Sequence, residues 1–350
     1  MKTHPSIAAL ALLVHVAAAP PVLAQAAAAQ SAGRTAPSPL APSEIVAAAP
    51  GSDWKAIAAA DLLVMTLAPD AKGAARRVVI QLMPPPFSQG WVGNIRKLAA
   101  AHWWDGLSVN RVQDNYVAQW GDADGEDKVK ARALPAGLAV VPESEYYGFS
   151  PKEVFYTIRT LKTPSAVRTK DVYAPVSSFV RGWPVGINDG GYRFRGKLPR
   201  RVVADPPPAP AIWPVHCYGM VGVGRNLSPD TGSGAELYTV IGHAPRHLDR
   251  NIALVGRVIE GIEHLSSLPR GTEALGFYKT AAERTPIVSI RLGGEVADLP
   301  RYEYLSTESA SFAKYADARA NRRDAFFIRP AGGADICNIP VPVRRVKVVG

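Results

Sequence analysis

Proline and glycine occur along the whole of this chain and limit the length of the elements that it can form. The 350 residues include 31 prolines and 30 glycines, which favours many turns over long helices. Because 47% of the residues are hydrophobic, the chain can bury a large core, and a wholly disordered or collagen-like protein is excluded. We therefore expect a globular fold with short elements and frequent turns.

The first 24 residues have the pattern of a secretory signal peptide. Lys2 precedes an almost wholly apolar run from Ile7 to Ala19, and Val22–Leu23–Ala24 offers a cleavage site before Gln25. The apolar run is too short for a comfortable membrane span, which favours a signal peptide. The alternative interpretation is a retained anchor or a buried helix. No later segment approaches about 18 uninterrupted apolar residues, so no stable membrane span is expected. We expect an exported protein, and the alanine-rich leader indicates the bacterial periplasm.

The two cysteines, Cys217 and Cys337, would lie in an oxidising compartment after export. A disulfide between them would close a loop of about 120 residues and, in the chain-entropy model, would contribute at most roughly 4–5 kcal/mol. Two separate buried thiols are the alternative. Two cysteines are too few for a four-thiolate zinc site.

Composition divides the rest of the chain into three parts. Residues 25–52 are rich in Ala, Pro and Ser and predict a flexible linker. A globular domain is expected over 53–293, interrupted by a long irregular insertion at about 123–215. Residues 294–350 form a C-terminal extension with one helix predicted over 307–322.

Periodicity predicts short elements within the globular domain. Strands are predicted at 61–68, 76–83, 219–223, 237–241, 252–255 and 287–292. One helix is predicted over 88–104, with Ser88 as its N-cap, and another over 256–268.

Positive charge is concentrated in the insertion. From Pro151 to Arg201 there are eleven Lys and Arg residues against three Asp and Glu, in a chain of net charge +10. Two interpretations stay open: a solvated insertion, or a contact with an anionic lipid surface or an acidic client. Export argues against nucleic acid as a partner.

The segment over residues 104–122 is the most informative for function. Asp114–Asn115 favours a turn between two strand-like runs. Because residues two apart on a strand share a face, this turn places Arg111 opposite Gln119. The apolar neighbours of this pair are Tyr116 and Val117. A fixed cation, an amide and an apolar wall would then lie together.

This segment resembles the cyclophilin signature, which is roughly F-H-R-[IV]-x-x-G-F-[MV]-x-Q-x-G-D. The matching residues, in chain order, are Trp104–Asp105–Gly106, Val109–Asp122, Gly219–Gly224, Gly234–Thr239, Leu248–Asp249 and Val255–Val258. Order and most spacings agree from about residue 53 to residue 293, apart from a longer region before Gly219.

The resemblance implies a mainly β fold: a closed eight-stranded antiparallel barrel capped by two helices, with the long insertion and the C-terminal tail added. It implies a peptidyl-prolyl cis–trans isomerase that acts on X–Pro bonds of polypeptide clients, without a cofactor or metal. Arg111 would donate a hydrogen bond to the prolyl nitrogen, and Gln119 would hold a substrate carbonyl and orient Arg111. The implied proline pocket contains Tyr116, Val117, Tyr238 and Leu248. The alternative for Arg111 is an ordinary surface arginine whose stem packs on a neighbouring ring.

The rim of the implied site departs from the family pattern. Glu236 replaces a glutamine, and its charge could pair with Arg111. Gly224 replaces an alanine, His247 an aromatic residue and Ile252 a histidine. These changes leave open a second hypothesis, a catalytically weak or inactive proline-peptide binding module on a cyclophilin scaffold.

Overall fold

The computed structural model describes residues 39–149, 153, 157, 171–188, 192–195, 198–201 and 210–346. The predicted signal peptide, the linker before Pro39 and part of the basic segment 151–201 lie outside the described residues. Within the part of the chain that is described, no helix has the length and apolar character needed to cross a membrane.

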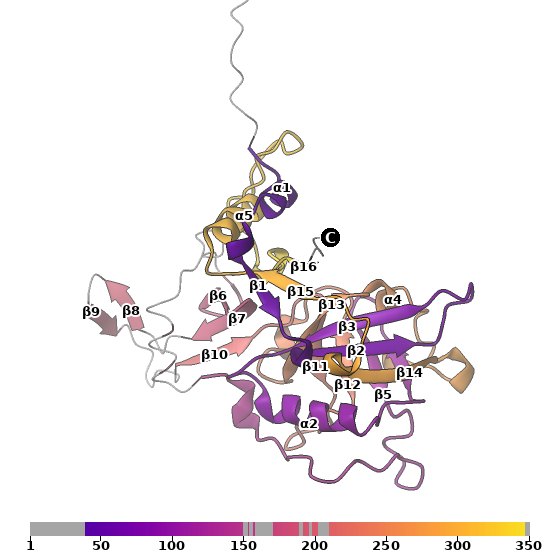
Figure 1. Cartoon of the computed structure of the whole chain (residues 1–350). Helices are drawn as coiled ribbons and strands as arrows, with labels where there is room; N and C mark the ends of the chain where they lie inside the picture. The colour runs from indigo at the N-terminus through magenta and orange to yellow at the C-terminus, as the bar shows by residue number, and fades with distance from the viewer. Residues whose placement is uncertain are drawn as a thin grey trace, which may run out of the picture. The chain divides into compact units, whose positions relative to one another are not determined.

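Eight antiparallel strands close into a barrel in the order β11-β12-β5-β4-β14-β2-β3-β13, which confirms the expected fold class (Figure 1). In chain order these strands are β2 (Leu62–Leu67), β3 (Arg76–Leu82), β4 (Ser108–Val112), β5 (Val117–Gly121), β11 (Met220–Val223), β12 (Leu237–Val240), β13 (Leu254–Glu260) and β14 (Thr285–Leu292). Alternate residues such as Val78, Ile80 and Leu82 fill the main core. The barrel follows from this period of two, because one face of every strand is apolar.

Helix α2 (Gln89–Ala100) buries Trp91, Ile95 and Leu98 beside the barrel strands β13 and β14. The prediction that Ser88 caps this helix is wrong: its backbone is left-handed, with φ of 54°, and its side chain makes no capping bond. Instead, the carboxylate of Glu145 accepts a 2.8 Å hydrogen bond from the Gly90 amide. A residue of the insertion therefore satisfies the first turn of the helix.

The helix predicted over 256–268 is wrong in its first half. Strand β13 continues to Glu260, where Arg257 pairs with Gln81 and Val258 pairs with Ile80 of β3. Only α4 (Glu263–Ser266) is helical. The apolar spacing suits a helix, but the barrel closes only if a strand joins β3 to β11, and this tertiary requirement decides the conformation.

The insertion contains regular structure that the sequence did not predict. Strands β6 (Val176–Val180), β7 (Trp183–Asn188) and β10 (Ala211–Pro214) form an antiparallel sheet with β7 in the middle. Strands β8 (Tyr192–Arg195) and β9 (Leu198–Arg201) pair as a separate two-stranded sheet.

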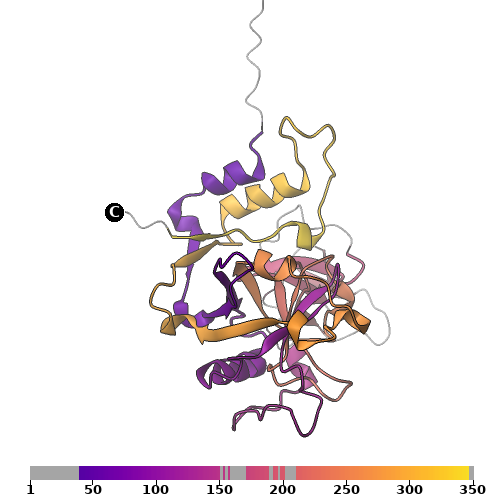
Figure 2. The same cartoon turned by 90° about the vertical axis from the view of Figure 1, so that its right-hand side faces the viewer.

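The C-terminal extension pairs with the start of the described chain. Strand β15 (Tyr302–Leu305) lies between β1 (Trp54–Ile57) and β16 (Val343–Arg345). Helix α5 (Ala310–Ala320), which confirms the predicted tail helix, lies beside α1 (Pro42–Ala47) (Figure 2). Residues 42–47, expected within the linker, are thus helical.

The short 3-10 helices are η1 (Gly51–Asp53), η2 (Ala59–Asp61), η3 (Glu143–Tyr146), η5 (Arg246–Leu248), η6 (Ala274–Gly276), η7 (Ala281–Glu283), η8 (Gly293–Glu295) and η9 (Ile336–Asn338).

A second hydrophobic core joins the insertion to the extension. Phe179 of β6 meets Phe312 of α5 edge to face, with ring centroids 4.9 Å apart. The Cys217–Cys337 disulfide crosses the same core, with Cα atoms 5.1 Å apart. The insertion and the extension therefore stabilise each other and are not two independent appendages.

Candidate active site

The β4–β5 hairpin sets the geometry of the candidate site. Its register pairs Arg111 with Gln119, and the turn contains Asn115 with φ of 50°. A register shift between Val109 and Arg111 interrupts the alternation of β4, so Val109 lies in the core while the Arg111 side chain is on the outer face. Trp120 of β5 likewise faces the core. The pair therefore lies outside the barrel.

Three neutral acceptors hold the guanidinium of Arg111. Its Nη1–H donates to Gln119 Oε1 at 3.1 Å, its Nη2–H donates to Gln113 Oε1, and its Nε–H donates to the carbonyl of Leu275 at 2.7 Å. None of the ion pairs formed within the described ranges involves Arg111. Burial lowers the pKa of Arg111 from its ordinary value, yet a guanidinium stays protonated at neutral pH. The result is a fixed positive charge that forms no ion pair with a carboxylate of the described residues.

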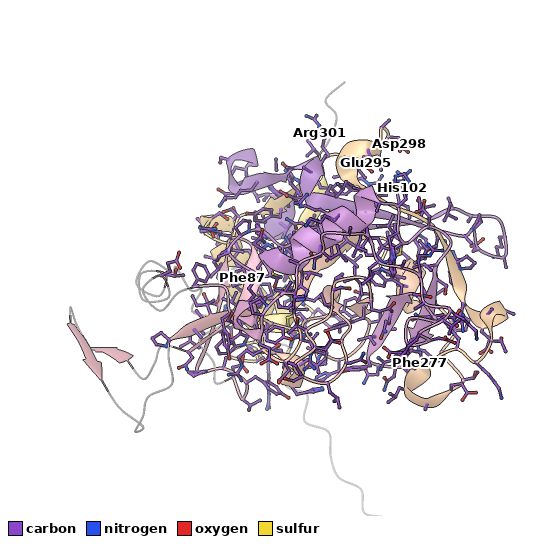
Figure 3. The ribbon with its side chains drawn as sticks, turned by 90° about the horizontal axis from the view of Figure 1, so that it is seen from below. Phe87, His102, Phe277, Glu295, Asp298 and Arg301 are labelled. Carbon is purple, nitrogen blue, oxygen red and sulfur yellow. A yellow bond between two sulfur atoms is a disulfide. The ribbon has the colours of Figure 1, made fainter. Side chains whose placement is uncertain are left out.

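Two aromatic rings flank this cation. The Arg111 Cζ atom lies 5.8 Å from the Tyr116 ring centroid and 5.4 Å from the Phe277 ring centroid, which suits cation–π contact. Phe277 follows η6 and is 39% exposed (Figure 3). Sequence reasoning missed Gln113, although it follows Arg111 by two residues. It also missed Leu275 and Phe277, for which no local signal exists.

An apolar cluster adjoins the cation on the same outer face. Its members are Tyr116, Val117, Tyr238, Val240 and Ile252. Tyr238 of β12 stands opposite Gln119 in the strand register. His247 stacks on Tyr116 with an interplanar angle of 8° and ring centroids 6.5 Å apart. Leu248 is half-buried beside His247 in η5. The structure thus brings Tyr116, Val117 and Tyr238 together in one cluster, whereas the predicted pocket residue Leu248 is not a member of it.

Glu236 does not pair with Arg111, contrary to the expectation from its charge. Its Oε1 accepts a 2.6 Å hydrogen bond from the Asp122 amide, and the polar side chains of Gln119 and Asn110 also favour its charged form. Burial raises the pKa of Glu236 to about 7, although these polar groups oppose the shift.

Gly224 makes room for this arrangement. A Cβ atom at Gly224 would lie 3.0 Å from the Cβ of Glu236 and 3.7 Å from Nε2 of Gln119. The absence of a side chain there lets Glu236 approach Gln119 from behind. Gln119 therefore lies between the two charged groups: its Oε1 accepts from Arg111, and its side chain favours the charged form of Glu236.

A family model described as cyclophilin type peptidyl-prolyl cis-trans isomerase/CLD matches residues 79–291, more than half of the chain. The chain belongs to this cyclophilin family. Among solved structures, this cyclophilin is similar to the cyclophilin AquaCyp293 from Hirschia baltica, with 18% sequence identity and a TM-score of 0.58 over 84% of this chain and 95% of that one. A cyclophilin type isomerase from Cryptosporidium parvum matches with 11% identity and a TM-score of 0.37, over 66% of this chain and 96% of that one. The comparison with curated proteins finds no match.

This cyclophilin combines an arginine–glutamine pair with an unusual rim. Gly224 and Glu236 lie behind the pair, and His247 lies at the edge of the apolar cluster. The central pair has the geometry of a rigid hydrogen-bond donor beside an apolar surface. The rim residues change the charge and shape that a bound peptide would meet on either side of it.

Proposed function

We propose that the protein catalyses cis–trans isomerisation of X–Pro bonds in polypeptide clients, with Arg111 as the catalytic residue. The observation that carries this proposal is the guanidinium of Arg111, fixed by three neutral acceptors next to the apolar cluster. The cluster would bind the proline ring, and the cation would lie over the bond that rotates.

The chemistry depends on the prolyl nitrogen. Resonance gives the peptide bond a rotation barrier of about 18–20 kcal/mol, and uncatalysed X–Pro exchange takes tens to hundreds of seconds. Twisting the bond localises the lone pair on nitrogen, so a donor placed there binds the twisted state better than the planar one. Because a guanidinium is permanently charged, no proton transfer is needed.

Arg111 has donors left for this contact. A guanidinium carries five N–H groups, and the residues described here accept from three of them. One N–H remains on each of Nη1 and Nη2 for a substrate. Gln119 uses its carbonyl oxygen on Arg111, so its amide N–H groups can hold a substrate carbonyl.

The hydrogen bond from Arg111 supplies part of the acceleration. A hydrogen bond to a charged group contributes about 1.5–3 kcal/mol, which is about one or two factors of ten in rate. A million-fold effect needs about 8 kcal/mol. The remainder would come from holding the twisted conformer against the apolar cluster and from excluding water.

Exchange spectroscopy on a proline-containing tetrapeptide tests this function. The wild-type protein should accelerate exchange, and Arg111→Ala should reduce the rate by about 10–100-fold because one charged hydrogen bond is lost. Arg77→Ala is the matched control, since Arg77 is a β3 residue whose ion pair with Asp298 lies outside the site. Equal rates for wild type and Arg111→Ala would contradict the proposed role.

The altered rim supports a second candidate, a proline-peptide binding module without catalysis. Glu236 and His247 give the cluster a charge and a shape that differ from the family pattern. This candidate predicts that the peptide shifts NMR signals of Tyr116 and Val117 while its exchange rate stays at the uncatalysed value.

We also propose that the clients are exported proteins. The support is the sequence of the first 24 residues of this chain, which has the pattern of a signal peptide. Folding assistance would then take place in the periplasm. The basic segment 151–201 would add a contact with anionic surfaces. Replacing its lysines and arginines, except Arg181, with glutamine should abolish binding to anionic vesicles while leaving peptide exchange intact, because the strands and Asp171 are kept.

A further inference from the structure

A buried hydrogen-bonded network lies behind Tyr238, on the side away from Arg111. The Tyr238 hydroxyl is 2.9 Å from Nε2 of His216, and Nδ1 of His216 is 2.9 Å from Oδ1 of Asp249. His216 is completely buried, and its backbone N–H also donates to Asp249 at 2.9 Å. Neither His216 nor Asp249 belongs to the set that the sequence pointed to as pocket residues.

The partners of His216 determine its protonation. Because Nδ1 faces a carboxylate, that nitrogen carries the proton, and Nε2 is left as an acceptor. Burial lowers the pKa of His216, although Asp249 opposes the shift, so the ring is neutral near pH 7. The Tyr238 hydroxyl therefore donates to Nε2, and Nδ1–H donates to Asp249.

The backbone around Tyr238 leaves room for its ring to extend to Nε2 of His216. Tyr238 pairs with Gly222 across β11 and β12, and a Cβ atom at Gly222 would lie 2.3 Å from the Tyr238 hydroxyl. The hydroxyl thus passes directly over Gly222. The Tyr238 and His216 rings are nearly parallel, with an interplanar angle of 11°. Only a residue without a side chain at position 222 permits this placement.

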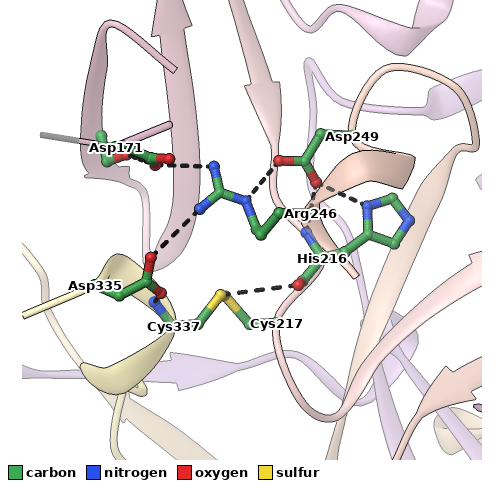
Figure 4. Close-up of a disulfide and its surroundings, with 8 residues drawn as sticks. Asp171, His216, Cys217, Arg246, Asp249, Asp335 and Cys337 are labelled. Atoms are coloured by element: carbon green, nitrogen blue, oxygen red, sulfur yellow. Dashed lines mark hydrogen bonds and ion pairs between the residues drawn. A yellow bond between two sulfur atoms is a disulfide. The ribbon is translucent and has the colours of Figure 1, made fainter. Parts of the chain in front are cut away.

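The insertion and the extension hold the network in place (Figure 4). Arg246, which is 3% exposed, donates from Nε to Asp249 at 2.6 Å and from Nη2 to Asp171 of the insertion at 2.9 Å. His216 directly precedes Cys217, whose disulfide connects it to Cys337 of the extension. The position of His216 is therefore fixed by the disulfide at the next residue and by Asp249, which is itself held by the ion pair with Arg246.

We propose that His216 is a positioning residue of the proline site, an inference that rests on the proposed function. By accepting the Tyr238 hydroxyl, His216 fixes the ring in the apolar cluster and directs its polar end away from the substrate. The tyrosine then offers an apolar wall. The insertion and the extension, through Arg246 and the disulfide, are thereby part of the peptide-binding site.

Two variants separate the two bonds of His216. His216→Asn places its amide near the Nδ1 position, so it keeps a donor for Asp249 but has no acceptor within reach of Tyr238. His216→Gln extends to the Nε2 position and can accept from the hydroxyl. We expect His216→Asn to raise KM for an X–Pro peptide about tenfold with a smaller change in kcat, and His216→Gln to recover part of the loss.

A double-mutant cycle with Tyr238→Phe distinguishes positioning from general structural support. Without the hydroxyl there is nothing for His216 to hold, so His216→Asn should change KM less than about twofold in the Tyr238→Phe background. An equal change of KM in both backgrounds would overturn the proposal.

Nitrogen-15 NMR of His216 gives a readout that does not need activity. We expect a neutral ring protonated on Nδ1, and a proton on Nε2 would overturn the proposal even if the variants fail to fold. The wild-type exchange rate and peptide affinity are measured first. If both are absent, the proposed function fails, whereas the tautomer still decides whether His216 accepts the Tyr238 hydroxyl.

Discussion

Glu236→Gln should remove a fall in the free energy of unfolding that the wild-type protein shows between about pH 4.5 and pH 7. The carboxyl of Glu236 has a pKa of about 7 in the folded protein because of burial, against 4.5 for an exposed glutamate. Below about pH 4.5 it is protonated in both states and contributes no pH dependence. Between these values the unfolded chain releases the proton while the folded protein keeps it, so the free energy of unfolding falls as pH rises.

The magnitude follows from the width of this window. Each pKa unit corresponds to about 1.4 kcal/mol, so the shift of Glu236 lowers the free energy of unfolding by at most about 3 kcal/mol once the pH exceeds 7. A glutamine has the same shape, can accept from the Asp122 amide and has no proton to lose. The variant should therefore gain stability relative to wild type as pH rises from about 5 to 8.

Urea unfolding followed by tryptophan fluorescence, repeated across this pH range, measures the difference. Glu283→Gln is the control: hydrogen bonds from Thr272 and Thr280 lower the pKa of Glu283, so its contribution to stability changes only at more acidic pH. Its curve should run parallel to wild type. If the Glu236→Gln curve also runs parallel, the carboxyl is not protonated in the folded state and the reasoning fails.

Further predictions concern the cation and the second core. Arg111→Lys keeps a positive charge but loses the fork that binds three acceptors, so peptide exchange should fall nearly as far as in Arg111→Ala; full exchange in the lysine variant would show that charge alone suffices. Phe277→Ala removes one ring from the cation and should lower kcat/KM by about threefold, from a contact worth about 0.5–1 kcal/mol, and no change would remove Phe277 from the site. The Cys217→Ser, Cys337→Ser double variant should lose about 2–4 kcal/mol of unfolding free energy in urea, and a reducing agent should then have no further effect.

Local sequence patterns were sufficient to predict the pairing of Arg111 with Gln119 at the centre of the site. The turn at Asp114–Asn115 and the two-residue period of a strand together predict that Arg111 lies opposite Gln119, and the register has this pairing. Such a prediction needs only contacts between neighbouring strands. The same period would have indicated Gln113, which shares a face with Arg111.

Contacts between distant segments explain the rest. The helix expected over 256–268 has apolar spacing that suits both conformations, and only the closure of the barrel makes its first half a strand. Leu275 and Phe277 contact Arg111 from a loop that is at least 164 residues away in sequence. The sequence around Arg111 therefore does not predict these contacts. His216 likewise lies in a region that reads as irregular, and its role depends on Tyr238 on a different strand.

The pairing of β1 with β15 has a consequence for how the chain reaches its native state. Trp54, near the start of the described chain, stands opposite Leu305, so the whole barrel is synthesised between the two halves of one small sheet. A nascent chain can complete its barrel while β1 still has an open edge. That edge is a potential site of association between immature copies until β15 emerges and pairs with it, so β15 also protects the N-terminal strand late in synthesis.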